Sequence, residues 1–170
     1  MSRIFFTADQ HFGHANIIKL CSRPFSCLVE MDEVLIDAWN SVVGDTDVVY
    51  VVGDFAYKSA ADPASYFKRL RGSKHLLVGN HDCSKTKHLP WVSVGETVIR
   101  EFHGTRLHVH HYPLREWQGY YQRAVHLHGH THGSIPNMPG SIDVGVDSHG
   151  FKPWSIEEIL DATRQWREST

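Results

Sequence analysis

The stretch DVVYVVGDF, residues 47–55, decides the fold. Its run of valine and tyrosine, residues 48–52, contains no charged position. Such a run is typical of a strand that is buried on both faces and is therefore central in its sheet. Gly53 ends the run and Asp54 follows directly. The sequence thus predicts a sheet whose middle strand carries a carboxylate just beyond its carboxyl end.

Helical patterns lie on either side of this strand. Residues 28–42 repeat apolar side chains at steps of three and four, the period of a helix that faces the core, and we expect Gly44 to end it. After the strand, Asp62 is a typical cap for a helix that begins at Pro63. The inward-facing positions expected in the first helix are Leu28, Met31, Val34, Leu35, Ala38, Trp39 and Val42.

Strands are predicted more often in the second half of the chain. Residues 74–78 form a short apolar run before a glycine, and residues 124–128 form another. Residues 96–102 and 105–111 flank a His-Gly turn, as the two strands of a β-hairpin would. Each of these runs is followed by polar residues, so the second half repeats the plan of the first.

The order of these elements predicts an α/β fold with mixed sheets sandwiched by helices, in one domain over residues 1–170. A chain of 170 residues with 41% hydrophobic content can enclose one sizeable core. Near the end, Ser155 and Glu158 have the spacing of a capping box for an amphipathic helix over residues 155–166. In such folds, ligands collect beyond the carboxyl ends of the strands.

Composition narrows the classes of partner. A formal net charge of −2 and a pI near 6.7 do not indicate a broad basic face for nucleic acid. The sequence has neither a signal-peptide pattern nor a run of about 18 apolar residues, so we expect a cytoplasmic protein with no membrane partner. No feature points to an obligate protein partner. Three cysteines without C-x-x-C spacing speak against both a disulfide framework and a thiolate zinc site.

Histidine is the unusual residue type, with 14 copies. This is about two to three times general usage. The histidines are interior and fall into groups, unlike an expression tag. Taken singly, an aspartate after a strand is usually a turn residue and a lone histidine is usually hydrogen-bonded. Here, however, polar residues follow five apolar runs in turn: Asp9, His11, Asp54, Asn80, His81, Asp82, His111, His130 and His132.

Five short motifs contain these residues: ADQHFGH at 8–14, VGDF at 52–55, GNHD at 79–82, HHYP at 110–113 and GHTHG at 129–133. Together they resemble the signature blocks of the calcineurin-like metallophosphoesterases. Further similarity to small bacterial and phage members lies in NII, RPF, DVGVD and KPWSIEEI, so that the resemblance covers nearly the whole chain.

The resemblance implies a four-layer α/β/β/α sandwich with a site for two metal ions. Carried over residue by residue, it implies that Asp54 bridges both ions. The ligands of one ion would be Asp9, His11, Asp54 and His132. Those of the other would be Asp54, Asn80, His111 and His130.

The residue types suit this assignment. A carboxylate has two oxygens and can bind two cations, whereas an imidazole offers one nitrogen to one metal. Mixed nitrogen and oxygen ligands suit manganese, iron, zinc, cobalt or nickel better than calcium or magnesium, and the ligand types do not choose among these five. Manganese is the metal that we expect. Asn80 supplies an oxygen without cancelling positive charge, and an anionic phosphate ester is the expected substrate.

The expected reaction is hydrolysis of a phosphodiester or phosphomonoester by a hydroxide that bridges the two metals. By resemblance, His81 would assist the leaving group as catalytic histidine. Asp82 would orient that ring or serve a turn, and His14 would contact phosphate or fix its loop. A nucleotide substrate is possible but not indicated by charge.

Two other readings compete with this one. A binding scaffold that keeps the fold without the chemistry would usually lose a ligand or the catalytic histidine, and every such position is filled here. A purely structural zinc site would be closed and rich in cysteine, which this set of residues is not.

Overall fold

Strand β2, Val48–Val51, lies third in a five-stranded sheet of order β4-β3-β2-β1-β9, which confirms the predicted central strand. The computed structural model describes residues 2–58 and 61–169. Strands β1 to β4 are parallel and β9 is antiparallel, so the sheet is mixed. The other strands of this first sheet are β1 (Ile4–Thr7), β3 (Ser73–Leu77), β4 (Ser93–Gly95) and β9 (Trp154–Ser155).

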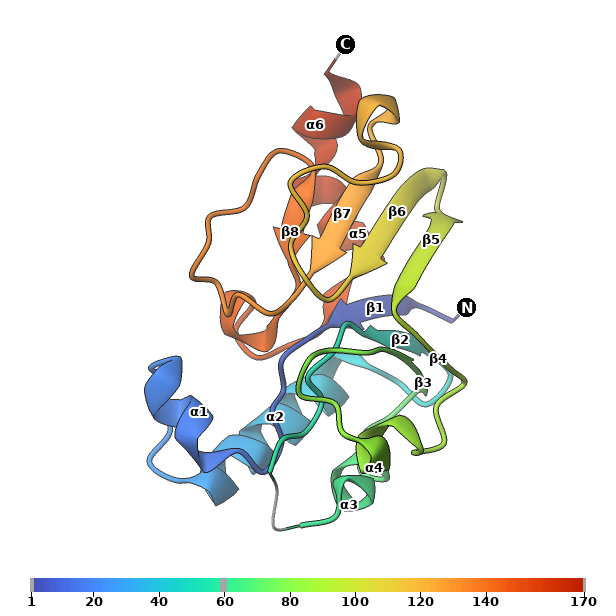
Figure 1. Cartoon of the computed structure of the whole chain (residues 1–170). Helices are drawn as coiled ribbons and strands as arrows, with labels where there is room; N and C mark the ends of the chain where they lie inside the picture. The colour runs from blue at the N-terminus through green and yellow to red at the C-terminus, as the bar shows by residue number, and fades with distance from the viewer. Residues whose placement is uncertain (1, 59–60, 170) are drawn as a thin grey trace.

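The second sheet has four strands in the order β5-β6-β7-β8 and is also mixed. Strands β5 (Thr97–Phe102) and β6 (Thr105–His110) form the expected antiparallel hairpin. Strands β7 (Val125–His128) and β8 (Ser141–Asp143) continue the sheet in parallel. Figure 1 shows this sheet in the upper half of the molecule and the first sheet in the lower half.

Alternation along β1 places two hydrophobic clusters on opposite faces of the first sheet. Phe5 belongs to the cluster that contains Leu35 and Trp39 of the long helix α2. Phe6 belongs to the cluster that contains Leu107 and Leu127 of the second sheet. Because successive strand residues point to opposite faces, one strand joins a helical layer to a sheet layer.

The helices are α1 (Ala15–Leu20), α2 (Leu28–Val42), α3 (Pro63–Phe67), α4 (Ser84–Lys87), α5 (Ile156–Ala162) and α6 (Arg164–Glu168), with 3₁₀ turns at Tyr120–Gln122 and Val146–Ser148. The helices predicted at residues 28–42 and from Pro63 are present, and α1 and α4 were not predicted. Asp62 caps α3 by accepting the Ala64 amide, and the capping box of Ser155 and Glu158 is formed, as predicted. None of the helices among the described residues is both long and apolar enough to cross a membrane.

Helix α2 differs from its predicted face. Val34 was expected to point inward but is exposed, whereas Asp32 and Ile36 are buried. Asp32 is held inside because it accepts hydrogen bonds from the Gly13 amide and the Tyr66 hydroxyl. The helix ends at Val42, as the pattern over residues 28–42 predicts, and Gly44 follows its C-cap residue, Val43. Because of the buried hydrogen bonds of Asp32, the face of α2 that packs against the core differs from the face predicted from its apolar residues alone.

The C-terminal helix is broken in two. A single helix over residues 155–166 was expected, but Thr163 separates α5 from α6. Its hydroxyl donates a hydrogen bond to the Ile159 carbonyl, a local bond that competes with regular helix geometry.

We predict that Phe6→Ala lowers the free energy of unfolding by about 3–5 kcal/mol. The Phe6 side chain is fully buried between the sheets, where it stacks on Tyr50 and meets the edge of Phe102. Urea unfolding measures the loss. Leu20→Ala is the control, because Leu20 is 73% exposed and should change stability by no more than about 0.5 kcal/mol. Equal losses in both variants would contradict the assigned core.

Candidate metal centre

The seven predicted ligand side chains lie beyond the carboxyl ends of five strands. Asp9 and His11 follow β1, Asp54 follows β2 and Asn80 follows β3. His111 follows β6 in the second sheet, and His130 and His132 follow β7. Since parallel strands end at the same edge of a sheet, residues far apart in sequence meet at one place.

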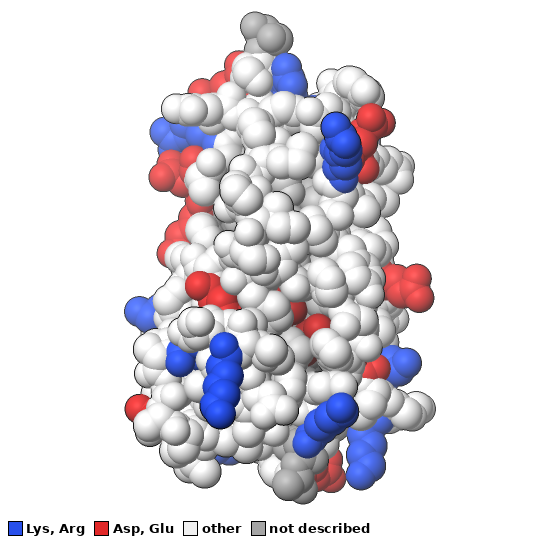
Figure 2. Space-filling view, turned by 60° about the vertical axis from the view of Figure 1, so that its left-hand side comes forward, with Lys and Arg blue, Asp and Glu red and all other residues white. Residues whose placement is uncertain are grey.

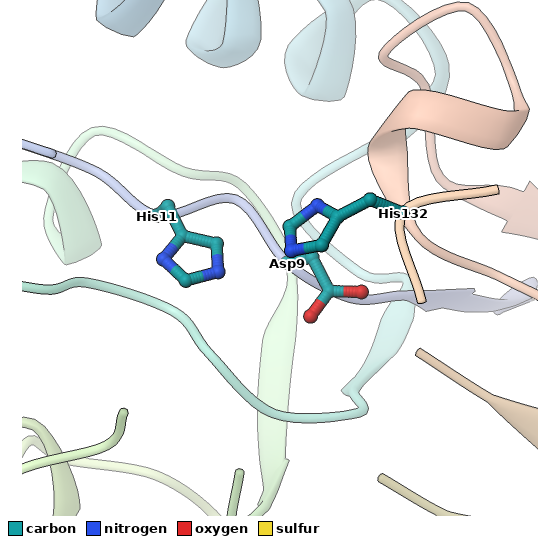
Figure 3. A group of neighbouring side chains, drawn as sticks. All are labelled: Asp9, His11 and His132. Carbon is teal, nitrogen blue, oxygen red and sulfur yellow. The ribbon is translucent and has the colours of Figure 1, made fainter. Parts of the chain in front are cut away.

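Asp9, His11 and His132 form one group. Each offers a potential ligand atom, and these atoms lie within 4.8 Å of one another. Figure 3 shows the two imidazole rings side by side, with the Asp9 carboxylate beside them. Asp9 and His11 come from the segment after β1, whereas His132 comes from the loop between β7 and β8.

Asp54, His111 and His130 form a second group with the same property. Asn80 belongs with it, since its Oδ1 lies 3.0 Å from His111 Nε2 and 3.0 Å from His130 Nδ1. The other ring nitrogen of His111 donates to the Val52 carbonyl at 2.8 Å, which leaves Nε2 facing the group. The donor set is therefore two imidazoles, a carboxylate and an amide oxygen.

Asp54 lies between the two groups. Its Oδ2 is 3.5 Å from His11 Nε2 and 3.5 Å from His111 Nε2. Its Oδ1 accepts the backbone N–H of His81 at 2.8 Å. One carboxylate thus touches a histidine from each group, which is the position that a bridging ligand would need.

The backbone at this site is unusual. Five of the seven residues have left-handed φ angles: Asp9 (60°), His11 (52°), Asp54 (57°), His130 (69°) and His132 (50°). Residues other than glycine adopt this region rarely and at a cost of about 1–3 kcal/mol each. Such conformations persist only where the surrounding structure enforces them, and they concentrate at functional sites.

Two glycines let the site close. A Cβ on Gly53 would collide with His111 and with the backbone of Gly79, and a Cβ on Gly79 would collide with the Asp54 side chain and amide. Gly53 also has a φ of 90°. The loops after β2 and β3 can therefore approach each other only because both positions lack a side chain.

The electrostatics of the site favour bound cations. Burial raises the pKa of Asp9 well above its ordinary value, and the carboxylates of Asp143 and Asp54 raise it further. Burial lowers the pKa of His11 to about 2, so this imidazole is neutral and its lone pair is available. Asp9 Oδ1 and His11 Nε2 are buried without a hydrogen-bond partner among the described residues. Orphaned atoms of these two types fit a divalent metal.

His81 lies at the edge of the two groups. Its ring is half-buried, with its centroid 5.3 Å from that of His11 and 4.2 Å from that of Tyr57. Asp82 serves the backbone, accepting the amides of Gly79 and Asp54 on Oδ2 and that of Phe55 on Oδ1. Of its two expected roles, the turn role is the one that these contacts support.

Sequence reasoning missed the side chains that hold the site from behind. Arg23 and Asp147 form a buried ion pair, and Asp147 Oδ2 lies 2.7 Å from His132 Nδ1. Asp143 accepts the Thr131 hydroxyl and the Gly133 amide, which fixes the loop of His130 and His132. The RPF and DVGVD motifs contain Arg23, Asp143 and Asp147, so the signal was present without an assigned role.

A third group, Cys21, His132 and Asp147, also places ligand-type atoms within 4.8 Å of one another. Burial raises the pKa of the Cys21 thiol to about 11, so it stays protonated at neutral pH. Both Asp147 oxygens already accept hydrogen bonds from Arg23. A cation here would face a neutral thiol and a neighbouring guanidinium, so this group is a poor metal site.

Charged side chains are unevenly spread over the face in Figure 2. Aspartate and glutamate residues are visible near its middle, while lysine and arginine residues lie toward its upper and lower parts without forming one continuous patch across it.

No protein-family model matches the chain. It is 33% identical to the uncharacterized protein MJ1445 of Methanocaldococcus jannaschii, in an alignment that covers 94% of this chain and 90% of the archaeal protein. The chain belongs to the family of this archaeal protein. A crystal structure of the protein of unknown function AQ665 from Aquifex aeolicus has 25% identity, a TM-score of 0.77, and coverage of 95% of this chain and 100% of that one. This chain and the Aquifex protein therefore share a fold.

A more distant solved structure is that of an archaeal phosphodiesterase. It has 16% identity and a TM-score of 0.44, over 84% of this chain and 82% of the other. A likeness this weak does not bear on the chemistry of the site.

We predict that Asp9→Asn stabilises the metal-free chain at pH 7. Between the ordinary pKa of 3.8 and the raised folded pKa, the folded chain binds more protons than the unfolded chain, so stability falls as pH rises. Removing this ionisation should therefore increase the free energy of unfolding. Urea unfolding with a chelator measures the gain.

Asp47→Asn is the matched control for this prediction. Asp47 is also buried but accepts hydrogen bonds from Arg3 and the Gly44 amide, so its substitution should lower stability. Added Mn²⁺ should stabilise the wild type more than Asp9→Asn. A loss of stability in metal-free Asp9→Asn would contradict the assigned electrostatics.

Proposed function

We propose that this chain is a metal-dependent phosphoesterase with a dinuclear site, of the calcineurin-like superfamily and its α/β/β/α layering. The observation that carries this proposal is the pair of ligand groups on either side of Asp54. Each group combines imidazole nitrogen with a carboxylate oxygen, and Asp54 Oδ2 is equidistant from His11 and His111. A site for one metal ion would use only one of the two ligand groups.

Asp9, His11, Asp54 and His132 would hold one divalent transition-metal ion, and Asp54, Asn80, His111 and His130 the other. Manganese is the metal that we propose, and iron, zinc, cobalt and nickel are also compatible with this mixture of ligands. When bound, such a pair supplies a nucleophile derived from water at neutral pH and neutralises phosphoryl oxygens. Two cations and two carboxylate ligands leave a net positive charge, which attracts an anionic substrate.

His81 would move the proton at the leaving group. Its side chain is partly open to solvent and lies beside His11, so a substrate bound to the metals would come within reach of the ring. The ring packs against Tyr57, which limits its rotation. Its backbone amide donates to Asp54 Oδ1. This hydrogen bond fixes the position of the proton donor relative to the central carboxylate.

The proposed substrate is a phosphate ester, a diester or a monoester, that needs no nucleic-acid platform. The net charge of −2 and the scattered basic side chains in Figure 2 support a small substrate. No membrane or obligate protein partner enters the proposal, and the chain is proposed to act in the cytoplasm as one domain.

We predict Mn²⁺-dependent hydrolysis of bis(nitrophenyl) phosphate, nitrophenyl phosphate or both. Asp54→Asn should reduce the rate to background because both ions lose a ligand. His81→Ala should lower kcat by about 10²–10⁴ while both ions still bind, since it removes only proton transfer. Release of nitrophenolate measures the rates, and metal analysis after gel filtration measures the bound ions.

His88→Ala provides the control, because His88 is an exposed histidine at the end of α4. It should hydrolyse both esters at the wild-type rate. Two bound ions with no turnover for any of the five metals would favour the scaffold reading over the enzyme.

A further inference from the structure

Arg23 and Asp147 form an ion pair inside the molecule, behind the first ligand group. Arg23 Nε and Nη2 donate to the two Asp147 oxygens, both at 2.8 Å. The Arg23 side chain has 0% exposure and that of Asp147 has 8%. The contact is bidentate, the geometry in which a guanidinium fixes a carboxylate most firmly.

The same guanidinium also holds the loop after β1. Arg23 Nη2 donates to the Asp9 carbonyl at 2.7 Å, and Nη1 donates to the Gln10 carbonyl at 3.0 Å. These carbonyls flank the left-handed backbone that turns Asp9 and His11 toward each other. One arginine therefore fixes the segment that supplies two of the three side chains in the first group.

Asp147 holds the third side chain. Its Oδ2 accepts from His132 Nδ1 at 2.7 Å. A carboxylate on Nδ1 fixes the imidazole tautomer, leaves Nε2 as the ligand atom and increases its basicity. The ion pair thus connects Asp9, His11 and His132.

Among the described residues, no arginine–carboxylate pair contacts the second group. Its His130 and Asn80 are exposed, and their contact with each other is a single hydrogen bond between Nδ1 and Oδ1. His111 is anchored through the Val52 carbonyl, and Asp54 through hydrogen bonds to its amide and its side chain. The first group is therefore held by a buried ion pair, whereas the second is open to solvent at His130 and Asn80.

We propose that Arg23 and Asp147 are positioning residues for the first metal, and that they make the two metal positions unequal. The ion among Asp9, His11 and His132 binds first and tightly, and the ion beside Asn80 exchanges. This inference rests on the metal pair of the proposed function. It adds that the first ion stays bound while the second exchanges. The Arg23–Asp147 ion pair maintains this difference without contacting either metal ion.

Calorimetric titration of the metal-free protein with Mn²⁺ tests this inference. The wild type should show two binding steps, and anomalous scattering from crystals with one equivalent of Mn²⁺ should place the ion among Asp9, His11 and His132. Asp147→Asn should weaken the first step by about 10- to 100-fold and leave the second almost unchanged.

Two further variants separate positioning from folding. Asp147→Asn leaves a buried guanidinium without its carboxylate, so the double variant Arg23→Met, Asp147→Asn removes both charges and should show the same selective loss. Asp47→Asn disrupts a different Arg–Asp pair, with the partly exposed Arg3, away from the site. It should lower the melting temperature without changing either binding step.

The outcomes distinguish this inference from the proposed function. Equal weakening of both steps, unchanged binding in the folded variants, or a first ion beside Asn80 would overturn the role of Arg23 and Asp147 even if the protein hydrolyses phosphate esters. Two unequal steps with the selective loss would support it even if no ester is hydrolysed. A wild type that binds no metal would overturn both.

Discussion

The placement of one buried carboxylate organises this molecule. Asp54 follows the central strand β2, has a left-handed φ of 57°, and lies 3.5 Å from a histidine of each sheet's loops. Asp82 holds its backbone amide, and the side chain accepts the His81 amide. Because burying an isolated carboxylate is unfavourable, this position requires positive charge nearby. The two histidine groups on either side are the means by which the chain would keep that charge in place.

Local signals made much of this predictable from sequence. An apolar run followed by a polar residue indicates a buried strand and the residue just past its end. This pattern occurred after β1, β2, β3, β6 and β7, with an intervening glycine after β2, β3 and β7. The capping box at Ser155 and the hairpin of β5 and β6 were predicted for the same reason. The rule that parallel strands share an edge predicts that polar residues after these strands meet at one place, whereas the choice of the seven side chains came from the resemblance of the motifs to a known family.

What could not be predicted depends on contacts between distant parts of the chain. Arg23 and Asp147 are 124 residues apart, and neither belongs to a periodic pattern that marks it as buried. Asp32 points inward on α2 because its carboxylate accepts hydrogen bonds from Gly13 and Tyr66. The periodicity of apolar residues along a helix carries no information about such contacts. The break at Thr163 likewise depends on one side-chain hydrogen bond that competes with the helix. Such polar contacts are decided by tertiary structure, after the apolar pattern has set the layers.

The left-handed residues at the site have one more consequence. An isolated peptide spanning residues 7–14 or 129–133 would relax to more populated backbone angles, because nothing in it enforces φ near +60° at Asp9 or His132. The same side chains transplanted onto the loops of an unrelated scaffold would point in other directions. The geometry of this cluster is therefore a property of the assembled pair of sheets, and its motifs bring these side chains together only within that architecture.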